Sequence, residues 1–179
     1  MKTFDQKSPY DSPWSMSERI KMLLWEYCWA IFCRWTPKPF NRWRLAWLKL
    51  FGAKIVGVPF VHQRARIQIP WNLTMHDRSS LGDRTSAYTL GEIEIGPHAT
   101  IAQEAYLCTG THDIAAQNFP LQVARITVGE GAFVAARAFV MPGVAIGKRA
   151  VIGAASVVTK DVPECAVVAG NPAVLIRQR

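Results

Sequence analysis

The chain of 179 residues lacks the short motifs that most directly indicate a catalytic or nucleotide-binding function. It contains no P-loop, no GxGxxG fingerprint and no GxSxG nucleophile elbow. Its four cysteines form no CxxC pair and show no metal-ligand spacing. This usage is typical of reduced, packed thiols in a cytoplasm-like compartment. The motif-defined nucleotide-binding and hydrolase classes are therefore excluded, and the function has to be sought in other features.

Acidic residues and long hydrophobic runs are also scarce. The chain has 13 acids against 21 Lys and Arg, and residues 1–54 hold ten of these bases and only four acids. No nucleic-acid motif accompanies the charge, so we expect no nucleic-acid partner, and a membrane face or an anionic glycolipid fits better. The apolar stretch 22–33 contains Glu26 and is too short to span a bilayer. The polar first 13 residues do not resemble a signal peptide, and we expect a cytoplasmic protein.

An aliphatic residue recurs at every sixth position through the second half of the chain, with one interruption. The positions are Ile95, Ile101, Leu107, Val128, Val134, Val140, Ile146, Ile152 and Val158. A helix repeats near 3.6 residues and a flat strand near 2, so neither explains this period. A hexapeptide repeat does, because each hexad forms one strand and one corner of a triangular coil. The prediction is an all-β core, a left-handed parallel β-helix whose aliphatic side chains stack inside.

The boundaries of this β-helix follow from the same pattern. It is expected to begin near Ile55, to slip in register near Ser79–Ser80 and to shift by two residues across Tyr88–Ile95. Four corners carry a glycine for which we expect a positive φ: Gly96, Gly129, Gly147 and Gly153. We divide the chain into a basic, Trp-rich helical segment, 1–54, and a β-helix domain, 55–179. The domain carries a C-terminal tail and a projecting loop, 113–127, of the kind that often carries function.

The first segment is expected to be helical after a disordered start at residues 1–14. Ser15 and Glu18 match a capping box, which predicts a helix from there to about Trp35. Two prolines then end this helix, and a second one is expected over residues 40–51.

Aromatic and basic side chains are mixed in the second helix. Three apolar residues share one face: Trp43, Trp47 and Leu50. Three bases lie off that face: Arg42, Arg44 and Lys49. Such a mixture suits peripheral membrane contact, and it also suits a cap on the open end of the β-helix or a subunit contact. Both uses of residues 15–51 stay open at this point.

Histidines are the remaining candidates for chemistry. His76, His98 and His112 are separated by 22 and 14 residues, which gives no near pair of ligands, so we expect no metal. His112 stands at the mouth of the projecting loop. Histidine ordinarily titrates near neutral pH, so this residue could take a proton from a hydroxyl, or it could simply bond the loop backbone.

Several short segments carry a family resemblance. They are Arg42–Arg44, Leu50–Lys54, Pro70–Leu73, Tyr88–Gly91, Tyr106–Asp113, Pro142–Gly147, Val151–Ala154 and Gly170–Ala173. Through them the chain resembles the hexapeptide-repeat O-acetyltransferases of exopolysaccharide synthesis, most closely the colanic acid biosynthesis acetyltransferase family. The last three segments recur across hexapeptide acyltransferases. The string Tyr106–Asp113 and the aromatic N-terminal helices are narrower signals.

The resemblance implies an acetyl-CoA-dependent homotrimer with active sites between subunits, acting on a sugar hydroxyl of an exopolysaccharide precursor. His112 matches the general base of the wider family. It would deprotonate the acceptor hydroxyl, which would then attack the thioester directly without an acyl-enzyme. Asp113 would orient His112 or the loop, or would serve only as a turn residue.

The resemblance also implies a coenzyme A groove. The family's groove residues carry over to Ala136, Ala154, Thr159, Lys160 and Arg177. Small side chains would let the pantetheine arm lie against a coil, and Lys160 and Arg177 would meet the phosphates. The chain has Phe133 where the wider pattern often has Trp, and so lacks that N–H donor.

Three functions remain in competition. The first is acetyl transfer to a lipid-linked glycan acceptor, with the protein cytoplasmic and peripheral on the inner membrane face. The second is acetyl transfer to a soluble small acceptor such as a free sugar, an amino acid or an antibiotic. The third is a non-catalytic β-helix scaffold, which would have no need of His112.

Overall fold

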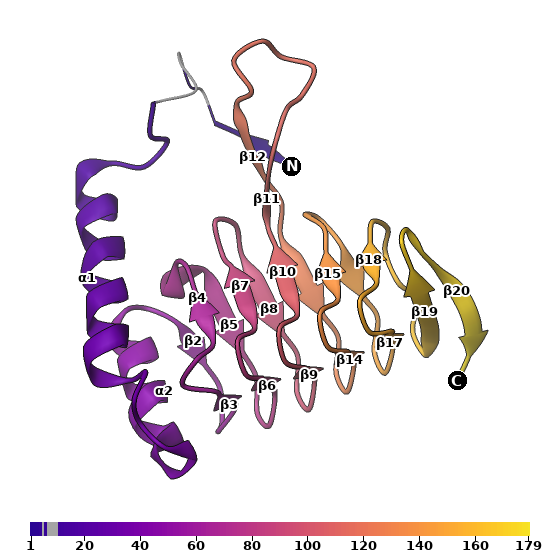
Figure 1. Ribbon diagram of the computed structural model, residues 1–179, viewed down its shortest axis with the longest axis horizontal. Helices are drawn as coiled ribbons and strands as arrows, with labels where there is room; N and C mark the ends of the chain where they lie inside the picture. Colours follow the sequence, from indigo (N-terminus) through magenta and orange to yellow (C-terminus); the bar gives the residue numbers. More distant parts are fainter. Residues whose placement is uncertain (5, 7–10) are drawn as a thin grey trace.

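The computed structural model describes residues 1–4, 6 and 11–179, and it confirms the parallel β-helix (Figure 1). Three sheets form the faces of a prism. Face 1 contains β2 (Lys54–Ile55), β5 (Leu73–Met75), β8 (Ile93–Ile95), β13 (Ile126–Val128) and β16 (Ala145–Ile146). Face 2 contains β3 (Phe60–Val61), β6 (Ser80–Leu81), β9 (Thr100–Ile101), β14 (Phe133–Val134), β17 (Val151–Ile152), β19 (Ala166–Gly170) and β20 (Ala173–Gln178). Face 3 contains β4 (Arg66–Ile67), β7 (Ser86–Tyr88), β10 (Tyr106–Cys108), β15 (Phe139–Val140) and β18 (Val157–Val158).

The core is the stack of aliphatic side chains that the six-residue period predicts. All nine predicted positions are buried, none more than 2% exposed. Within face 1, for example, Ile95 pairs with Val128, and Val128 pairs with Ile146. Burial of these side chains in register is the main stabilising contribution to the prism.

The coils do not all have the same length. Ile55 pairs with Met75 and Met75 with Ile95, so the first two repeats are 20 residues long, whereas Val128 and Ile146 are 18 apart. The predicted slip at Ser79–Ser80 is wrong, because the two extra residues lie between Ile67 and Met75. There the short helix η2 (Pro70–Asn72) widens the corner. The shift across Tyr88–Ile95 is confirmed by the next repeat.

The corner glycines serve a purpose that the sequence did not indicate. The left-handed conformation was expected at Gly96, Gly129, Gly147 and Gly153, and none of them adopts it. A Cβ on Gly129 would lie 2.6 Å from the backbone nitrogen of Lys148, and one on Gly147 would lie 2.5 Å from that of Glu164. The expectation is therefore wrong, and glycine is required there because the next coil passes too close for a side chain.

The left-handed conformation falls instead on larger corner residues, including His98, Glu104, Arg137 and Arg149. Their backbone N–H groups bond the coil before: Arg137 donates to Gln103 at 3.1 Å and Arg149 to Glu130 at 2.8 Å. The conformation therefore turns a corner N–H along the prism axis, where it stabilises coil stacking.

Two helices close the N-terminal end of the prism. They are α1 (Met16–Phe32) and α2 (Asn41–Leu50), joined through η1 (Lys38–Phe40). The capping box of Ser15 and Glu18 is confirmed. The Trp25 indole N–H donates to the Ile67 carbonyl at 2.7 Å, and the Asn41 side chain accepts from the Val61 N–H at 3.0 Å. The helices thus satisfy the open strand edges of the first coil, as a cap should.

Arg44, which the sequence placed off the apolar face of the second helix, lies in the interior of the protein. Its side chain is fully buried. The guanidinium donates to the Val61 carbonyl at 2.8 Å, the Thr36 hydroxyl at 2.8 Å and the Pro37 and Lys38 carbonyls at 3.0 and 3.1 Å. The burial of Arg44 could not be predicted from helical periodicity, because a base in this sequence context is usually exposed. Here its hydrogen bonds join the helical cap to the first coil.

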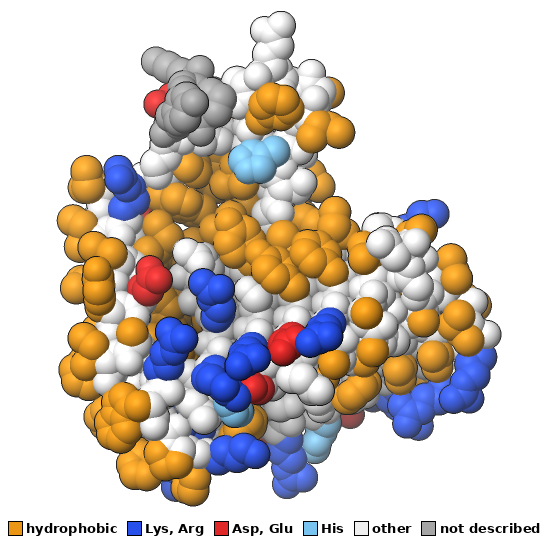
Figure 2. All heavy atoms as spheres, in the orientation of Figure 1, with side chains coloured by type: hydrophobic (Ala, Val, Ile, Leu, Met, Phe, Trp, Pro, Cys, Tyr) orange, Lys and Arg blue, Asp and Glu red, His pale blue; other side chains and the backbone are white. Residues whose placement is uncertain are grey.

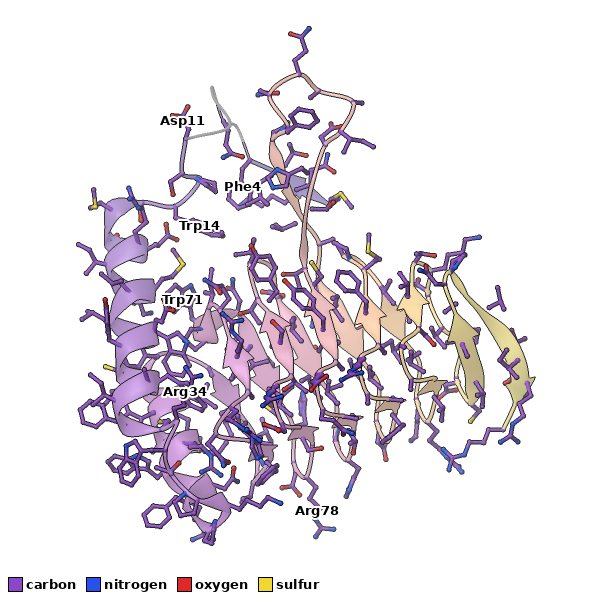
Figure 3. All side chains as sticks on the ribbon, viewed as in Figure 1. Phe4, Asp11, Trp14, Arg34, Trp71 and Arg78 are labelled. Carbon is purple, nitrogen blue, oxygen red and sulfur yellow. The ribbon has the colours of Figure 1, made fainter. Side chains whose placement is uncertain are left out.

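The start of the chain is more ordered than the sequence suggested. Residues 1–14 were expected to be disordered, but Lys2–Thr3 form strand β1, which pairs with β12 (Leu121–Val123). Phe4 and Trp14 pack together with their ring centroids 5.3 Å apart, between α1 and the projecting segment (Figure 3). For the described residues the expectation is wrong. Its remainder, residues 5 and 7–10, lies outside the described residues.

Candidate active site

A β-hairpin arm projects from the prism where β10 ends (Figure 1). Strand β11 (Gly110–His112) pairs antiparallel with β12, and His112 lies opposite Leu121. The tip comprises residues 113–120, and the rest of the predicted loop 113–127 is partly strand, in β12 and the beginning of β13. We call residues 110–123 the arm.

His112 is exposed on the arm and makes one well-defined bond. Its Nδ1 lies 2.7 Å from the carbonyl oxygen of Phe119. A carbonyl can only accept, so the assigned tautomer carries its proton on Nδ1. The neutral ring then presents the lone pair of Nε2 to the outside. This is the arrangement that a general base requires.

The arm segment that carries the Phe119 carbonyl is bonded to Gln6, which is far away in the chain. Asn118 donates through its side chain to the Gln6 carbonyl at 2.7 Å, and the Gln6 side chain accepts from the Leu121 N–H at 2.8 Å. Gln6 is thus hydrogen-bonded to the arm on both sides of Phe119. No motif in the sequence signals this role of Gln6, because the bonds cross more than a hundred residues.

Asp113 shapes the tip of the arm. Its carboxylate accepts from Ala115 N–H at 3.0 Å, and its own N–H donates to the Pro120 carbonyl at 3.0 Å. The first of these is an Asx turn. The geometry favours a role in forming the loop that carries Phe119 over direct contact with His112.

The coenzyme A candidates occupy two different edges of face 3. Ala136 and Ala154 stack at the corner between faces 2 and 3, where Ala155 N–H donates to the Ala136 carbonyl at 2.9 Å. Thr159 and Lys160 are exposed at the opposite edge, the corner between faces 3 and 1, from which the arm also rises. Within one chain the structure therefore brings His112 to the same edge as Lys160 and separates it from the alanine corner.

Arg177 lies on face 2. It pairs with Val167 on β19 and lines a hollow of about 500 Å³. The other lining residues are Gly131, Phe133, Val151, Val167 and Arg179. Arg179 is a second base at this hollow that the sequence did not single out, although both lie in the basic end of the chain.

An aromatic row runs along face 3 from coil to coil, between these two edges. The Tyr106 and Phe139 rings stack with centroids 5.0 Å apart, and Tyr88 lies 6.0 Å from Tyr106. Burial raises the pKa of Tyr106 to about 12, so the phenol stays neutral. Figure 2 shows hydrophobic side chains gathered on the prism below the arm. This row is only half-buried in the single chain, which suits a surface that meets another subunit.

Cys108 lies just before the arm, but it is a poor nucleophile. Its thiol lies 3.1 Å from the Gly110 carbonyl, and burial raises its pKa. Because the thiolate is the reactive form, a buried neutral thiol does not favour a covalent acyl-cysteine route.

Face 1 holds a separate open groove of about 760 Å³. At its edge His76 Nε2 donates to Glu94 at 3.0 Å, and Arg125 bonds the other oxygen of that carboxylate. Across residues 1–4, 6 and 11–179, no three His, Cys, Asp or Glu side chains are grouped so as to hold a metal ion. Two ion pairs, His76 with Glu94 and Lys148 with Glu130, line this groove.

Comparison with known proteins decides the family. No family model matches the chain. The putative colanic acid biosynthesis acetyltransferase WcaF of Escherichia coli K12 is 46% identical over 160 residues, which cover 89% of this chain and 88% of the relative. The chain belongs to the colanic acid biosynthesis acetyltransferase family. The resemblance drawn from the sequence segments is confirmed, and the protein is an acetyltransferase.

Solved structures support the fold of this acetyltransferase. A galactoside acetyltransferase in complex with coenzyme A superposes with a TM-score of 0.83 at 22% identity, covering 93% of this chain and 84% of that one. A hexapeptide-repeat acetyltransferase from Vibrio cholerae gives 0.82 at 21% identity over 92% and 93%. At these identities the likeness establishes the architecture alone. In the described part of the acetyltransferase, no helix is long and apolar enough to cross a membrane.

Proposed function

We propose that the protein transfers the acetyl group of acetyl-CoA to a sugar hydroxyl of an exopolysaccharide precursor, with His112 as the general base. The observation that carries this is the Nδ1 bond of His112 to the Phe119 carbonyl, which leaves Nε2 as a free base on an exposed arm. Family membership supplies the acetyl chemistry.

The reaction needs one proton relay and no covalent enzyme intermediate. Nε2 takes the proton of the acceptor hydroxyl while the oxygen attacks the thioester carbonyl. When the tetrahedral intermediate collapses, the C–S bond breaks, and the imidazolium returns the proton to the coenzyme A thiolate. The Phe119 carbonyl keeps the ring oriented and stabilises the imidazolium through its Nδ1–H.

Acetyl-CoA is proposed to lie along the alanine corner. Ala136 and Ala154 themselves project only a methyl group, so an extended pantetheine arm fits against them. Arg177 and the neighbouring Arg179 are exposed cations that can meet phosphates, and Lys160, at the arm edge, would do so from the next subunit. The neutral Thr159 can add a hydroxyl contact. No metal takes part in this proposal.

The active form is proposed to be a homotrimer with its sites between subunits. The base and the alanine corner lie at opposite edges of face 3, so one chain cannot present both to one substrate. If face 3 of each chain turns toward a threefold axis, the arm edge of one subunit meets the alanine corner of the next. The aromatic row of Tyr88, Tyr106 and Phe139 would then be buried around the axis.

The acceptor is proposed to be a lipid-linked glycan at the cytoplasmic face of the inner membrane. The WcaF relative is named for colanic acid biosynthesis, which supports a polysaccharide precursor. The basic first 54 residues fit an acceptor held near an anionic surface.

The test is transfer of labelled acetyl from acetyl-CoA to panels of lipid-linked and free oligosaccharides by wild type, His112→Asn and His98→Asn. Asparagine at 112 can still donate to the Phe119 carbonyl but cannot act as a base. A base of this kind contributes about 10²- to 10⁴-fold, so kcat should fall by that amount with coenzyme A binding retained. His98 is exposed with a positive φ that asparagine tolerates, and its variant should match wild type. Equal activity of all three proteins would refute the assignment of the base.

A further inference from the structure

The outward side of α1 is an apolar surface. The inward side packs on the prism through Trp25, while six side chains at helical spacing point away from it. They are Met16, Ile20, Leu23, Leu24, Tyr27 and Ile31, each between 52% and 65% exposed. We call these six residues the outer stripe. Figure 2 shows hydrophobic side chains along the outer edge of α1.

The apolar surface continues beyond the end of α1. Trp35 is 71% exposed and Leu50 is 73% exposed, with Phe40 and Trp43 exposed between them. Capping the β-helix needs only the inward side of these helices, so the cap does not explain the outward one. An exposed apolar surface of this kind marks an interaction site.

Positive charge borders this surface. Over residues 15–50 the exposed bases are Arg19, Lys21, Arg34, Lys38, Arg42 and Lys49, and the exposed acid is Glu26. Residues 1–54 contain ten bases and four acids in all. One of these acids, Glu18, is engaged in the helix cap with Ser15. The partner of the outer stripe should therefore be apolar and negatively charged.

We propose that the outer stripe docks the protein on an anionic lipid bilayer, with α1 lying in the plane of the interface. Tyrosine and tryptophan prefer this region because each has an apolar ring and a polar edge. A second copy of this face is disfavoured as the partner, because two net-positive surfaces would meet. Spanning the bilayer is disfavoured because α1 has 17 residues and four charged side chains.

The position of α1 suits this role. It lies across the end of the prism (Figure 1), so three β-helices aligned in parallel would present three outer stripes at one end. Only the presence of three outer stripes on one assembly rests on the proposed trimer. Three stripes would strengthen vesicle binding through multivalency. Vesicle binding itself does not depend on acetyl transfer, so loss of either property would be recognised separately.

The experiment is sedimentation of the full chain with vesicles of phosphatidylcholine alone and of phosphatidylethanolamine with phosphatidylglycerol. Three proteins are compared: wild type, Leu23→Gln/Tyr27→Gln/Ile31→Gln, and Val174→Gln/Leu175→Gln/Ile176→Gln. The last triple is the matched control, since these three side chains on β20 are 57–59% exposed. We expect wild type and control to bind the anionic vesicles, and the stripe variant to bind at least tenfold more weakly.

A second variant tests the charge. Arg19→Gln should weaken binding to anionic vesicles about fivefold, the equivalent of about 1 kcal/mol for one base, and have little effect with phosphatidylcholine. Equal binding of wild type and stripe variant, or no binding by wild type, would overturn the proposal. Dissociation of the oligomer by the stripe variant, with vesicle binding unchanged, would assign the stripe to a subunit contact instead. Helical content measured by circular dichroism confirms that the variants are folded.

Discussion

The side chain of Gln6 accepts a hydrogen bond from the backbone N–H of Leu121 at 2.8 Å, and Leu121 is the residue that pairs with His112. The carbonyl of Gln6 accepts another from Asn118. The first residues of the chain therefore hold the arm from which His112, the proposed base, projects. Leu121 is itself buried, so its N–H would lose its partner without Gln6.

Gln6→Ala should lower kcat by about three- to tenfold and leave the KM for acetyl-CoA nearly unchanged. An unsatisfied buried N–H costs about 1–3 kcal/mol, which here would be relieved by loosening of the arm and of the Phe119 carbonyl. Steady-state kinetics measures the effect, and hydrogen exchange at Leu121 should quicken.

The matched control for Gln6 is Gln122→Ala. Gln122 lies on the arm itself, and within the described residues the hydrogen bond of its side chain goes to the exposed Thr3 hydroxyl, at 3.3 Å. Similar losses in both variants would show that any damage to β12 suffices, and the specific positioning role of Gln6 would be untenable.

Much of the prism could be predicted because its period repeats. The nine aliphatic positions and the shift before Ile95 are consequences of side chains that must all face one interior. The function of the corner glycines could not be found in this way. A glycine that avoids a clash with Lys148 in the next coil looks the same in sequence as one that permits a positive φ.

In the candidate site too, the features with a local sequence pattern could be predicted and the long-range contacts could not. His112 was found because it ends a periodic run, and its bond to Phe119 agrees with a role that the sequence left open. The grip of Gln6 and the burial of Arg44 were missed, since both depend on contacts between segments that no local pattern links. Long-range pairing of polar groups is set by the fold as a whole and has no period.

Arg44→Met should destabilise the protein by about 2–4 kcal/mol. The substitution keeps the apolar volume but leaves the carbonyls of Val61, Pro37 and Lys38 without this donor. Chemical denaturation measures the loss. Arg44→Lys should recover only part of it, because one ammonium cannot reproduce the planar fork.

The control for Arg44 is its neighbour Arg42, which is exposed. Arg42→Met should shift stability by no more than about 0.5 kcal/mol. If both methionine variants cost the same, the buried network around Arg44 would not be the cause.

Stability should depend on pH through Glu94. The hydrogen bond from His76 holds the pKa of Glu94 below its usual range, and Arg125 acts in the same direction. A carboxyl with a lowered folded-state pKa stabilises the protein above its unfolded pKa, about 4.3, and loses this contribution as the pH falls through the folded value. Glu94→Gln should therefore cost up to about 1 kcal/mol at neutral pH and nothing in more acidic solution.

Urea unfolding at several pH values tests this, with Glu92→Gln as the comparison. Glu92 is the more exposed carboxylate, and its nearest approach to Arg125 is 3.8 Å. A cost for Glu94→Gln that grows with acidity would have the wrong sign and contradict the linkage.

Phe139→Glu should dissociate the oligomer. Phe139 stacks on Tyr106 in the aromatic row, and three carboxylates gathered near the proposed threefold axis would repel one another. Light scattering after size exclusion should report a monomer, with acetyl transfer lost. Ala145→Glu on the outer side of face 1 is the control and should keep both mass and activity. An active monomer would show that one chain holds a complete site.

Co-refolding two inactive variants into mixed oligomers should restore activity if each site is shared between subunits. His112→Asn lacks the base, and Ala154→Trp blocks the alanine corner at the far edge of face 3. In a mixed trimer, a subunit with the blocked corner still offers its own His112 to a neighbour whose Ala154 is intact, so some sites are whole. Co-refolding the two variants should yield a substantial fraction of wild-type kcat, while simple mixing of stable trimers should not. No recovery after verified subunit exchange would mean that base and groove come from the same chain, and the threefold arrangement about face 3 would have to be abandoned.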